Sequence, residues 1–523
     1  MRSTFSGLEI AKRSLFAQQT ALQTTGHNIS NANTKGYTRQ VVNLVASRPL
    51  EAVGMTSSAL PGQIGQGVEF DHINRIREKF LDNQFYNENK NYGEWSVRQD
   101  TLEKLETIVN EPSDTSIRTV MEKFWNSWQE LSKAPENLTA RAVVKENALA
   151  LTDAFNHVSN QLSDLNSDLT ENITVKATQI DTTLNQIVSL NKEIRRIEGL
   201  GNDANDLRDQ RDVLVDDLSK MINVTVTDTA NGYNISMGGT PLVTGINLEA
   251  TVDSDFLVDA SSSGELASGE VRGLIDSRDK IVTSFQKQLD TMVKTMAEGD
   301  VKVTLPAGTV LRGGTDLNPG ATPVTLSADT EVTVKGINGL HQLGYTLNGD
   351  ITSPGEPFFT LKDGATEFSA ASITVNPKIV KNVENIASSL RTYYDDVDKA
   401  TKVVKGNNGL ALLMSGLSTK DFNFDPANTG DTVLNGGTVD EFFRAFVGEI
   451  GVQSQEAQRQ ASNQKLLVDQ VDSRRQSVSG VSLDEEMANM IKYQHAYNAA
   501  ARAMTTFDEC LDKIINSMGV VGR

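Results

Sequence analysis

The two ends of the chain carry the same pattern of apolar positions, and each predicts a helix with one apolar face. Steps between these positions alternate between three and four residues, which keeps one face of a helix toward a partner helix. The C-terminal series is Leu483, Met487, Met490, Gln494, Tyr497, Ala501, Met504, Asp508, Leu511, Ile515 and Met518. The N-terminal series is Leu8, Ala11, Leu15, Gln18, Leu22, Thr25 and Ile29. We therefore predict that the two ends pair as a coiled coil and that these positions form an assembly seam.

The N-terminal helix is followed by a short polar run that predicts an ordered bend. The run from Asn28 to Tyr37 reads NISNANTKGY and is rich in Asn, Ser, Thr and Gly. Asn hydrogen-bonds its own backbone and tolerates the left-handed region, and Gly36 has no side chain to clash. Residues 41–45 can then extend as a strand.

This bend resembles the signature of bacterial flagellar axial proteins, in which Asn-Ile-x-Asn-x-x-Thr-x-Gly-Tyr follows an N-terminal helix. The run 479–518 is similar to the C-terminal end of that family, and stretches beginning at Asn110, Gly269 and Gly344 are similar to its hook-associated members. The matching positions in the bend are Asn28, Ile29, Asn31, Thr34, Gly36 and Tyr37.

The resemblance implies a structural subunit that joins hook to filament through packing of terminal helices. It implies self-association into a ring or helical layer, with hook protein below and the next hook-associated protein or filament above. It also implies an export chaperone, and unfolded export through the flagellar type III apparatus with an uncleaved signal. Residues 300–336, rich in Gly, Thr and Val, depart from the family pattern and interrupt an expected helix.

Two alternatives stay open. A hook or rod protein would share the termini, although the long helix predicted at 139–198 and the interior stretches favour a junction protein. A secreted enzyme, such as a peptidoglycan hydrolase with coiled-coil ends, would need an acid/base pair or a metal set in the middle of the chain. Residues 222–271 and 300–378 hold one histidine, His341, and no cysteine.

Between the termini the pattern predicts helices that bracket β structure. A heptad-like series predicts one helix of about 60 residues from Thr139, and further helices are predicted at 273–298, 379–405 and 439–477. Alternating residues with Asn231-Gly232 and Gly238-Gly239 turns predict hairpins within 222–271, and 300–378 is also β-like. The fold class is thus α+β multidomain. The expected domains are a terminal coiled coil (1–58 and 478–523), a mainly helical core (59–221, 272–299 and 379–477) and a β-rich outer insert (222–271 and 300–378).

Composition and motifs argue against several classes of partner and site. The formal net charge of −19 disfavours nucleic acid as a partner, although the first fifty residues carry six Lys or Arg against one Glu. Neither a cleaved secretory peptide nor a membrane span is expected, because the apolar runs are too short. The histidines stand outside zinc motifs, and Asp421-x-Asn423-x-Asp425 lacks the later calcium-loop residues. We therefore predict no catalytic, metal or cofactor site, and a packing role for the single Cys510.

Overall fold

The computed structural model describes residues 5–48, 65–109, 116–313, 315, 317–348, 356–427, 429–430 and 432–517. It divides into two compact units. The terminal unit comprises Met1–Trp95, Ile173–Gly273 and Ala461–Arg523, and the middle unit comprises Ser96–Asn172 and Leu274–Gln460. The α+β multidomain class is confirmed. The three-part domain division remains a prediction, because these units reflect contacts within one chain rather than independent folding.

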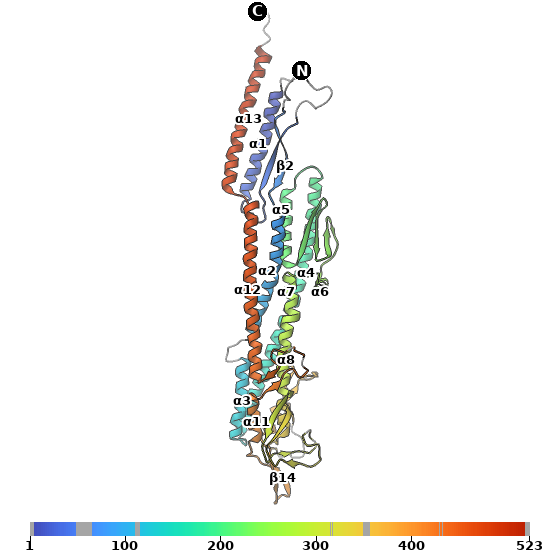
Figure 1. Ribbon diagram of the computed structural model, residues 1–523, viewed down its shortest axis with the longest axis vertical. Coiled ribbons are helices and arrows are strands. Elements are labelled where there is room, and N and C mark those ends of the chain that lie inside the picture. Colours follow the sequence, from blue (N-terminus) through green and yellow to red (C-terminus); the bar gives the residue numbers. More distant parts are fainter. Residues whose placement is uncertain are drawn as a thin grey trace, which may run out of the picture. The chain divides into compact units, whose positions relative to one another are not determined.

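The chain ends pair within the terminal unit. Helix α1 (Ser6–Ser30) lies between α13 (Leu483–Ser517) and the antiparallel strands β1 (Gln40–Ala46) and β2 (Val68–Arg75), as Figure 1 shows. The buried residues of α1 have short side chains, which lets neighbouring backbones approach closely. They are Ala11, Ala17, Ala21, Thr24, Thr25 and Asn28. The predicted pairing of the two terminal helices is confirmed.

Strands and helices in the rest of the terminal unit follow the predicted signals closely. A four-stranded antiparallel sheet is ordered β3 (Val224–Thr229), β4 (Gly232–Met237), β5 (Thr240–Thr244) and β6 (Asn247–Leu248). Its first two turns fall at Ala230-Asn231, one residue before the predicted Asn231-Gly232, and at Gly238-Gly239 as predicted. Helix α5 (Asn205–Met221) precedes the sheet, and α6 (Ser254–Ser263) follows it, capped by Asp253. The strand pattern expected for 222–271 therefore ends before α6.

Three long helices have residues in both units. These are α2 (Lys79–Val109), α4 (Leu138–Glu198) and α12 (Val439–Ser479). The 61 residues of α4 match the helix predicted from Thr139, and α12 matches the one predicted at 439–477. The helix predicted at 273–298 is also present, as α7 (Glu270–Asp276), a π-helical segment (Ser277–Val282) and α8 (Thr283–Glu298).

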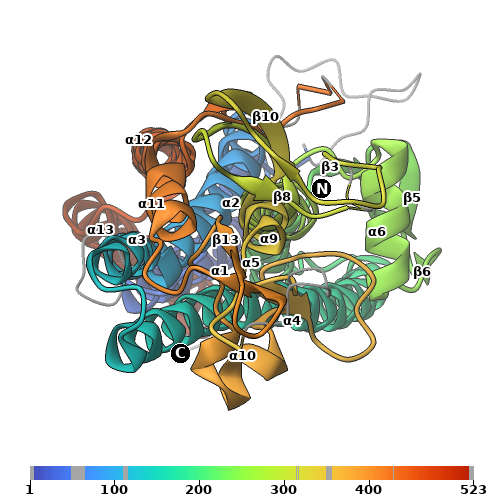
Figure 2. The same cartoon turned by 90° about the horizontal axis from the view of Figure 1, so that it is seen from below.

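The middle unit combines short helices with small antiparallel sheets. Helices α3 (Ile117–Lys133) and α11 (Gly409–Gly416) lie side by side (Figure 2). Helix α9 (Gly336–Leu343) begins directly after the strand that ends at Lys335. The largest sheet is ordered β10 (Thr330–Lys335), β7 (Asp300–Leu305), β15 (Phe422–Asn423) and β16 (Gly436–Gly437). Two-stranded sheets pair β8 (Val310–Leu311) with β9 (Val324–Thr325) and β11 (Phe359–Leu361) with β12 (Ile373–Val375).

The helix predicted at 379–405 is wrong. Helix α10 (Pro377–Lys381) stops at Asn382, whose side chain accepts a hydrogen bond from the Glu384 backbone N–H and so favours a turn. Residues Val383–Asn385 form a 3-10 turn, and strands β13 (Thr392–Asp395) and β14 (Ala400–Val403) form a hairpin. The consecutive Thr392, Tyr393 and Tyr394 favour strand over helix.

The interior of the middle unit contains a cluster of aromatic side chains. Trp128, Phe124, Phe358 and Phe359 are fully buried and their rings lie 5.0–6.4 Å apart. His341 joins this cluster, with its ring centroid 5.3 Å from that of Phe358. Such pairs add to the large area that each ring buries.

Candidate assembly site at the paired termini

Asn28 connects the end of α1 to the bend and to α13. Its Oδ1 accepts hydrogen bonds from the Tyr37 hydroxyl (2.7 Å) and from the Gln40 backbone N–H (3.0 Å). Its Nδ2 donates to the Gln40 carbonyl (2.8 Å) and to Glu486 Oε2 on α13 (3.0 Å). Both the oxygen and the nitrogen of this buried amide therefore have hydrogen-bond partners. Each partner must stay in place for the buried amide to remain satisfied.

The other motif residues shape the bend itself. The Asn31 side chain donates to the His27 carbonyl at the end of α1, and its Oδ1 accepts from the Thr34 hydroxyl. Gly36 has φ +78°, and a Cβ there would lie 2.0 Å from the side chain of Val213 on α5. Glycine is required for both reasons. Burial, followed by nearby Asp206, raises the pKa of Tyr37, so its hydroxyl stays protonated and can donate to Asn28.

A second link joins the bend to the start of α13. Arg39 Nε donates to Glu486 Oε1 and its Nη1 to Glu485 Oε2, each at 2.8 Å. The Arg39 backbone N–H donates to the Ser479 carbonyl at the end of α12 (2.8 Å). Because Glu486 is buried and also accepts from Asn28, its carboxylate fixes where α13 begins relative to α1.

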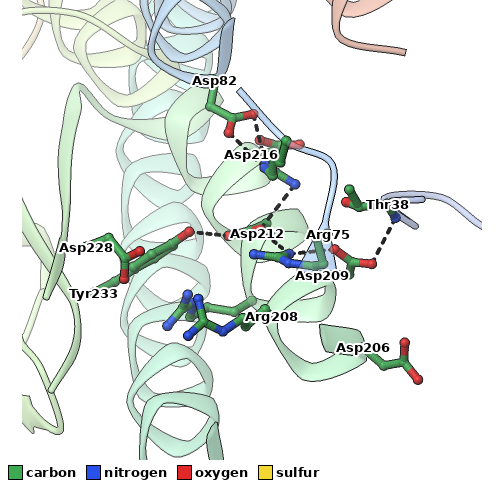
Figure 3. A network of polar contacts seen from close by, with 12 residues as sticks. Thr38, Arg75, Asp82, Asp206, Arg208, Asp209, Asp212, Asp216, Asp228 and Tyr233 are labelled. Atoms are coloured by element: carbon green, nitrogen blue, oxygen red, sulfur yellow. Dashed lines mark hydrogen bonds and ion pairs between the residues drawn. The ribbon is translucent and has the colours of Figure 1, made fainter. Parts of the chain in front are cut away.

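Beneath the bend, carboxylates of α5 meet arginines from the β2 region (Figure 3). Arg75 Nη1 lies 2.6 Å from Asp209 Oδ1 and 2.8 Å from Asp212 Oδ2. Asp209 also accepts from the Thr38 backbone N–H (2.9 Å), which ties the bend to α5. Burial acts to raise the pKa of Asp209 and the pKa of Asp212. At Asp209 this effect is larger than that of the neighbouring arginine, so the pKa is raised. At Asp212, Arg77 and Arg75 outweigh burial and hold the pKa below its usual range.

The same network reaches α2 and α12. Arg77 forms two hydrogen bonds with Asp82, at 2.7 and 2.9 Å, and lies 3.2 Å from Asp212. Arg475 on α12 lies 2.8 Å from Asp216 and 3.6 Å from Asp82. Burial raises the pKa of Asp216 to about 6 despite the favourable charge of Arg475. The network thus holds elements from both ends of the sequence in one charged interior.

The predicted seam residues are split by the structure. On α1, Leu8, Leu15, Leu22 and Ile29 are all half-buried. On α13, Leu511 is buried and four others are half-buried, namely Met490, Tyr497, Ala501 and Met504. Leu483, Met487 and Ile515 are exposed, and Met518 lies outside the described residues.

Buried residues of α13 include positions directly beside the predicted series as well as Leu511 within it. Glu486 and Ala500 are buried, although each directly precedes a seam residue. Apolar spacing alone could not predict that Glu486 is buried, because it is polar and its partners Asn28 and Arg39 lie far away in the sequence. The packing role predicted for Cys510 is wrong, since it is exposed beside the buried Leu511. Whether the exposed seam residues contact neighbouring subunits remains a prediction.

Sequence reasoning missed the polar partners of the motif. Arg39 and Glu486 are 447 residues apart, and no spacing rule connects them. The run of Asp and Arg in residues 206–217 was a visible signal, since charges in a helix that also carries buried apolar positions must be paired when they fall on the buried side.

Metal clusters and membrane-spanning helices are both absent from the described residues. Within those residues, no group of three or more His, Cys, Asp or Glu side chains is placed to hold a metal ion. None of the described helices combines the length and apolarity that a bilayer crossing requires. Asp209, Asp212 and Asp216 of α5 are paired with arginines, which suits a fixed interior. Asp206 and Asp217 of the same helix are exposed.

Comparisons with family models match three regions of the chain. Residues 102–300 match the helical domain of the flagellar hook-associated protein FlgK. Residues 8–38 match the flagella basal body rod protein family, and residues 473–518 match the C-terminal family of the flagellar basal body rod proteins FlgEFG. The two shorter matches fall on α1 with its bend, and on α13 with the last residues of α12.

Similarity to individual proteins extends over the whole chain. It is 36% identical to flagellar hook-associated protein 1 of Bacillus subtilis, covering 100% of both chains. It is 27% identical to flagellar hook-associated protein 1 of Salmonella typhimurium, covering 97% of this chain and 98% of the relative. The solved structure of the flagellar hook junction protein FlgK from Burkholderia pseudomallei shares the fold, with a TM-score of 0.52 at 15% identity over 76% of this chain and 100% of that one. This chain therefore belongs to the flagellar hook-associated protein 1 family.

Proposed function

We propose that this protein is a structural subunit of the junction between flagellar hook and filament, where copies join through their terminal helices. The observation that carries the proposal is the pairing of α1 with α13 in a chain similar along its full length to hook-associated protein 1. Part of the apolar series on α13 stays exposed in the single chain, at Leu483, Met487 and Ile515. Exposed apolar side chains in such a series favour a protein partner.

The proposal includes partners and location. Copies form a ring or helical layer, with hook protein on one side and the next hook-associated protein or filament on the other. An export chaperone accompanies the chain before it leaves through the flagellar type III apparatus without cleavage of a signal. We propose no enzymatic activity, and the match of residues 102–300 to a hook-associated helical domain favours the junction over a hook or rod role.

Deletion of the gene tests the proposal directly. Electron microscopy of the deletion strain should show hooks without filaments, with filament protein released into the medium. Expression of the wild-type chain should restore filaments. Normal filaments in the deletion strain would contradict the junction role, and loss of hooks would indicate a rod or hook protein instead.

A substitution on α13 tests the part that the helix plays. Ala501 is half-buried, and Arg there would put a long charged side chain into the helix contact. Ala501→Arg should be exported at the wild-type level but fail to attach filaments, whereas Asn498→Arg, at an exposed position, should behave as wild type. Equal motility of the two variants would count against terminal-helix packing as the basis of the junction.

A further inference from the structure

A groove of about 890 Å³ opens in the terminal unit between the bend, α4 and α5. Its floor includes the half-buried apolar residues Leu190, Val213 and Leu214. Residues of the bend, His27 to Tyr37, form one wall. The opposite wall is one face of α4, where the lining residues are all uncharged: Thr182, Asn185, Gln186 and Ser189. In a chain with 22% charged residues, the α4 wall of the groove is therefore uncharged, and the charges in its lining come from Lys35 of the bend and from Asp206 and Asp209 of α5.

An apolar ridge stands exposed at the start of α13 in the same unit. Leu483, Met487 and Ile491 are spaced four residues apart, so they form one row along the helix, and each is about half exposed. The row spans about 12 Å at 1.5 Å per residue, and the lining face of α4 from Thr182 to Ser189 spans about 10 Å. Rows of this spacing pack into the grooves of other helices.

Charged residues lie at both ends of the ridge and at both ends of the groove. Their signs are opposite when the ridge lies against the groove in one of the two possible directions. The ridge is flanked by Asp484 after Leu483 and by Lys492 after Ile491, and both are exposed. At one end of the groove, near Thr182, the exposed Lys35 lies 3.2 Å from Asp217.

At the other end, the exposed Asp206 accepts a hydrogen bond from the Gln40 side-chain amide (2.8 Å) and lies 3.6 Å from the His27 ring, with no Lys or Arg as its partner among the described residues. Because α5 follows α4 after the short connection 199–204, Asp206 lies toward the Ser189 end of the groove.

We propose that the groove receives the α13 ridge of a second copy of this chain, with Ile491 near Ser189 and Lys492 near Asp206. The inference rests on the proposed assembly function and adds to it the acceptor surface, the donor surface and their direction. Ridge and groove are different surfaces, so the contact is heterologous. Contacts of this type repeat from copy to copy and generate rings or helical layers.

Cysteine cross-linking in assembled flagella tests the contact. In a Cys510→Ser background, a chain carrying both Ile491→Cys and Ser189→Cys should give a ladder of dimers and higher oligomers after mild oxidation. The matched control carries Ile491→Cys with Thr182→Cys, at the opposite end of the same groove wall, and should give about tenfold less cross-linked product. A ladder only in the control, or in neither chain while filaments attach normally, would overturn the proposal but leave the junction role intact.

A charge exchange provides a second measurement that does not depend on disulfide geometry. Lys492→Glu should be exported normally and should weaken each contact by about tenfold, which corresponds to about 1.4 kcal/mol, so that fewer cells carry attached filaments. Asp206→Lys in the same chain should restore attachment. Failure of restoration, with both single variants folded and exported, would contradict the pairing of these two residues. Failure of the wild-type chain to restore filaments in the deletion strain would instead contradict the proposed function.

Discussion

The terminal unit and the middle unit are stabilised in different ways. The middle unit buries a cluster of aromatic rings, with Trp128 and Phe358 at its centre. The terminal unit places Arg75, Asp209 and Asp212 in its interior, and packs α1 through alanine and threonine side chains. Aromatic burial supplies large, weakly directional stabilisation, whereas buried ion pairs supply little net energy but demand one geometry. The difference suits a unit that must present its termini in a defined arrangement to neighbours.

The largest effect is expected in the aromatic cluster. Trp128→Ala should destabilise the middle unit by about 3–5 kcal/mol, because it removes a fully buried indole and leaves a cavity. Denaturant unfolding followed by hydrogen exchange in each unit measures this. Trp128→Phe is the matched control, since the Trp128 N–H is buried without a hydrogen-bond partner among the described residues. A loss of similar size in both variants would show that the indole has a polar role that its surroundings do not reveal.

The next effect concerns the charged interior of the terminal unit. Asp212→Asn removes a buried charge that lies close to Arg75 and Arg77, and it should destabilise this unit by about 3 kcal/mol because two largely buried cations lose a partner. Urea unfolding followed by hydrogen exchange at α5 measures the change. The surface pair Lys35–Asp217 is the control, and Lys35→Gln should cost under about 1 kcal/mol. Equal losses would mean that burial does not distinguish the two pairs.

A smaller effect is expected from Asn28, which links the bend to α13. Asn28→Ala leaves the Gln40 backbone groups and the Tyr37 hydroxyl without this partner, and should cost about 2 kcal/mol. Hydrogen exchange should quicken in residues 36–46 and 483–490 while the middle unit stays unchanged. The exposed Asn33 is the control, and Asn33→Ala should leave both segments protected. Protection in the Asn28 variant would show that Arg39 and Glu486 alone hold the bend to α13.

Local sequence patterns predicted most of the secondary structure named above, but they did not predict which polar side chains pair in the interior. The long helix α4, the terminal pair and the Asn-Gly hairpin follow from local spacing and turn chemistry, and all are present. The helix expected at 379–405 failed because Asn382 caps a turn and the following tyrosines favour a strand. The partners of Asn28 could not be predicted, since Glu486 lies 458 residues away and nothing in the spacing of polar residues selects one carboxylate among many.

Two buried titratable groups give the smallest and most discriminating prediction, because their pKa shifts have opposite signs. In the terminal unit, burial raises the pKa of Asp216 to about 6, above its usual 3.8. The folded state then holds the proton more tightly than the unfolded state, so the stability contributed by protonated Asp216 is present below about pH 4 and is lost as pH rises through 6. In the middle unit, burial lowers the pKa of His341 from 6.5 to about 4. The stability that neutral His341 allows is present above about pH 6.5 and is lost as pH falls toward 4.

Between pH 4 and 6, therefore, acidification should favour the terminal unit through Asp216 and weaken the middle unit through His341. Each group contributes at most one proton, or about 1.4 kcal/mol per pH unit. Hydrogen exchange in the two units, measured across this range, should reveal slopes that differ in sign after each variant is subtracted from wild type. Asp216→Asn should remove the falling slope of the terminal unit and leave the middle unit unchanged. His341→Gln should reduce the rising slope of the middle unit and leave the terminal unit unchanged.

The His341 effect depends on its ring staying neutral, with Nδ1 bound to the Glu356 carbonyl and Nε2 accepting from the Ala387 N–H. Slopes of the same sign in both units would show that solvent reaches one of these side chains, and that the contrast between a charged and an aromatic interior does not extend to their response to pH.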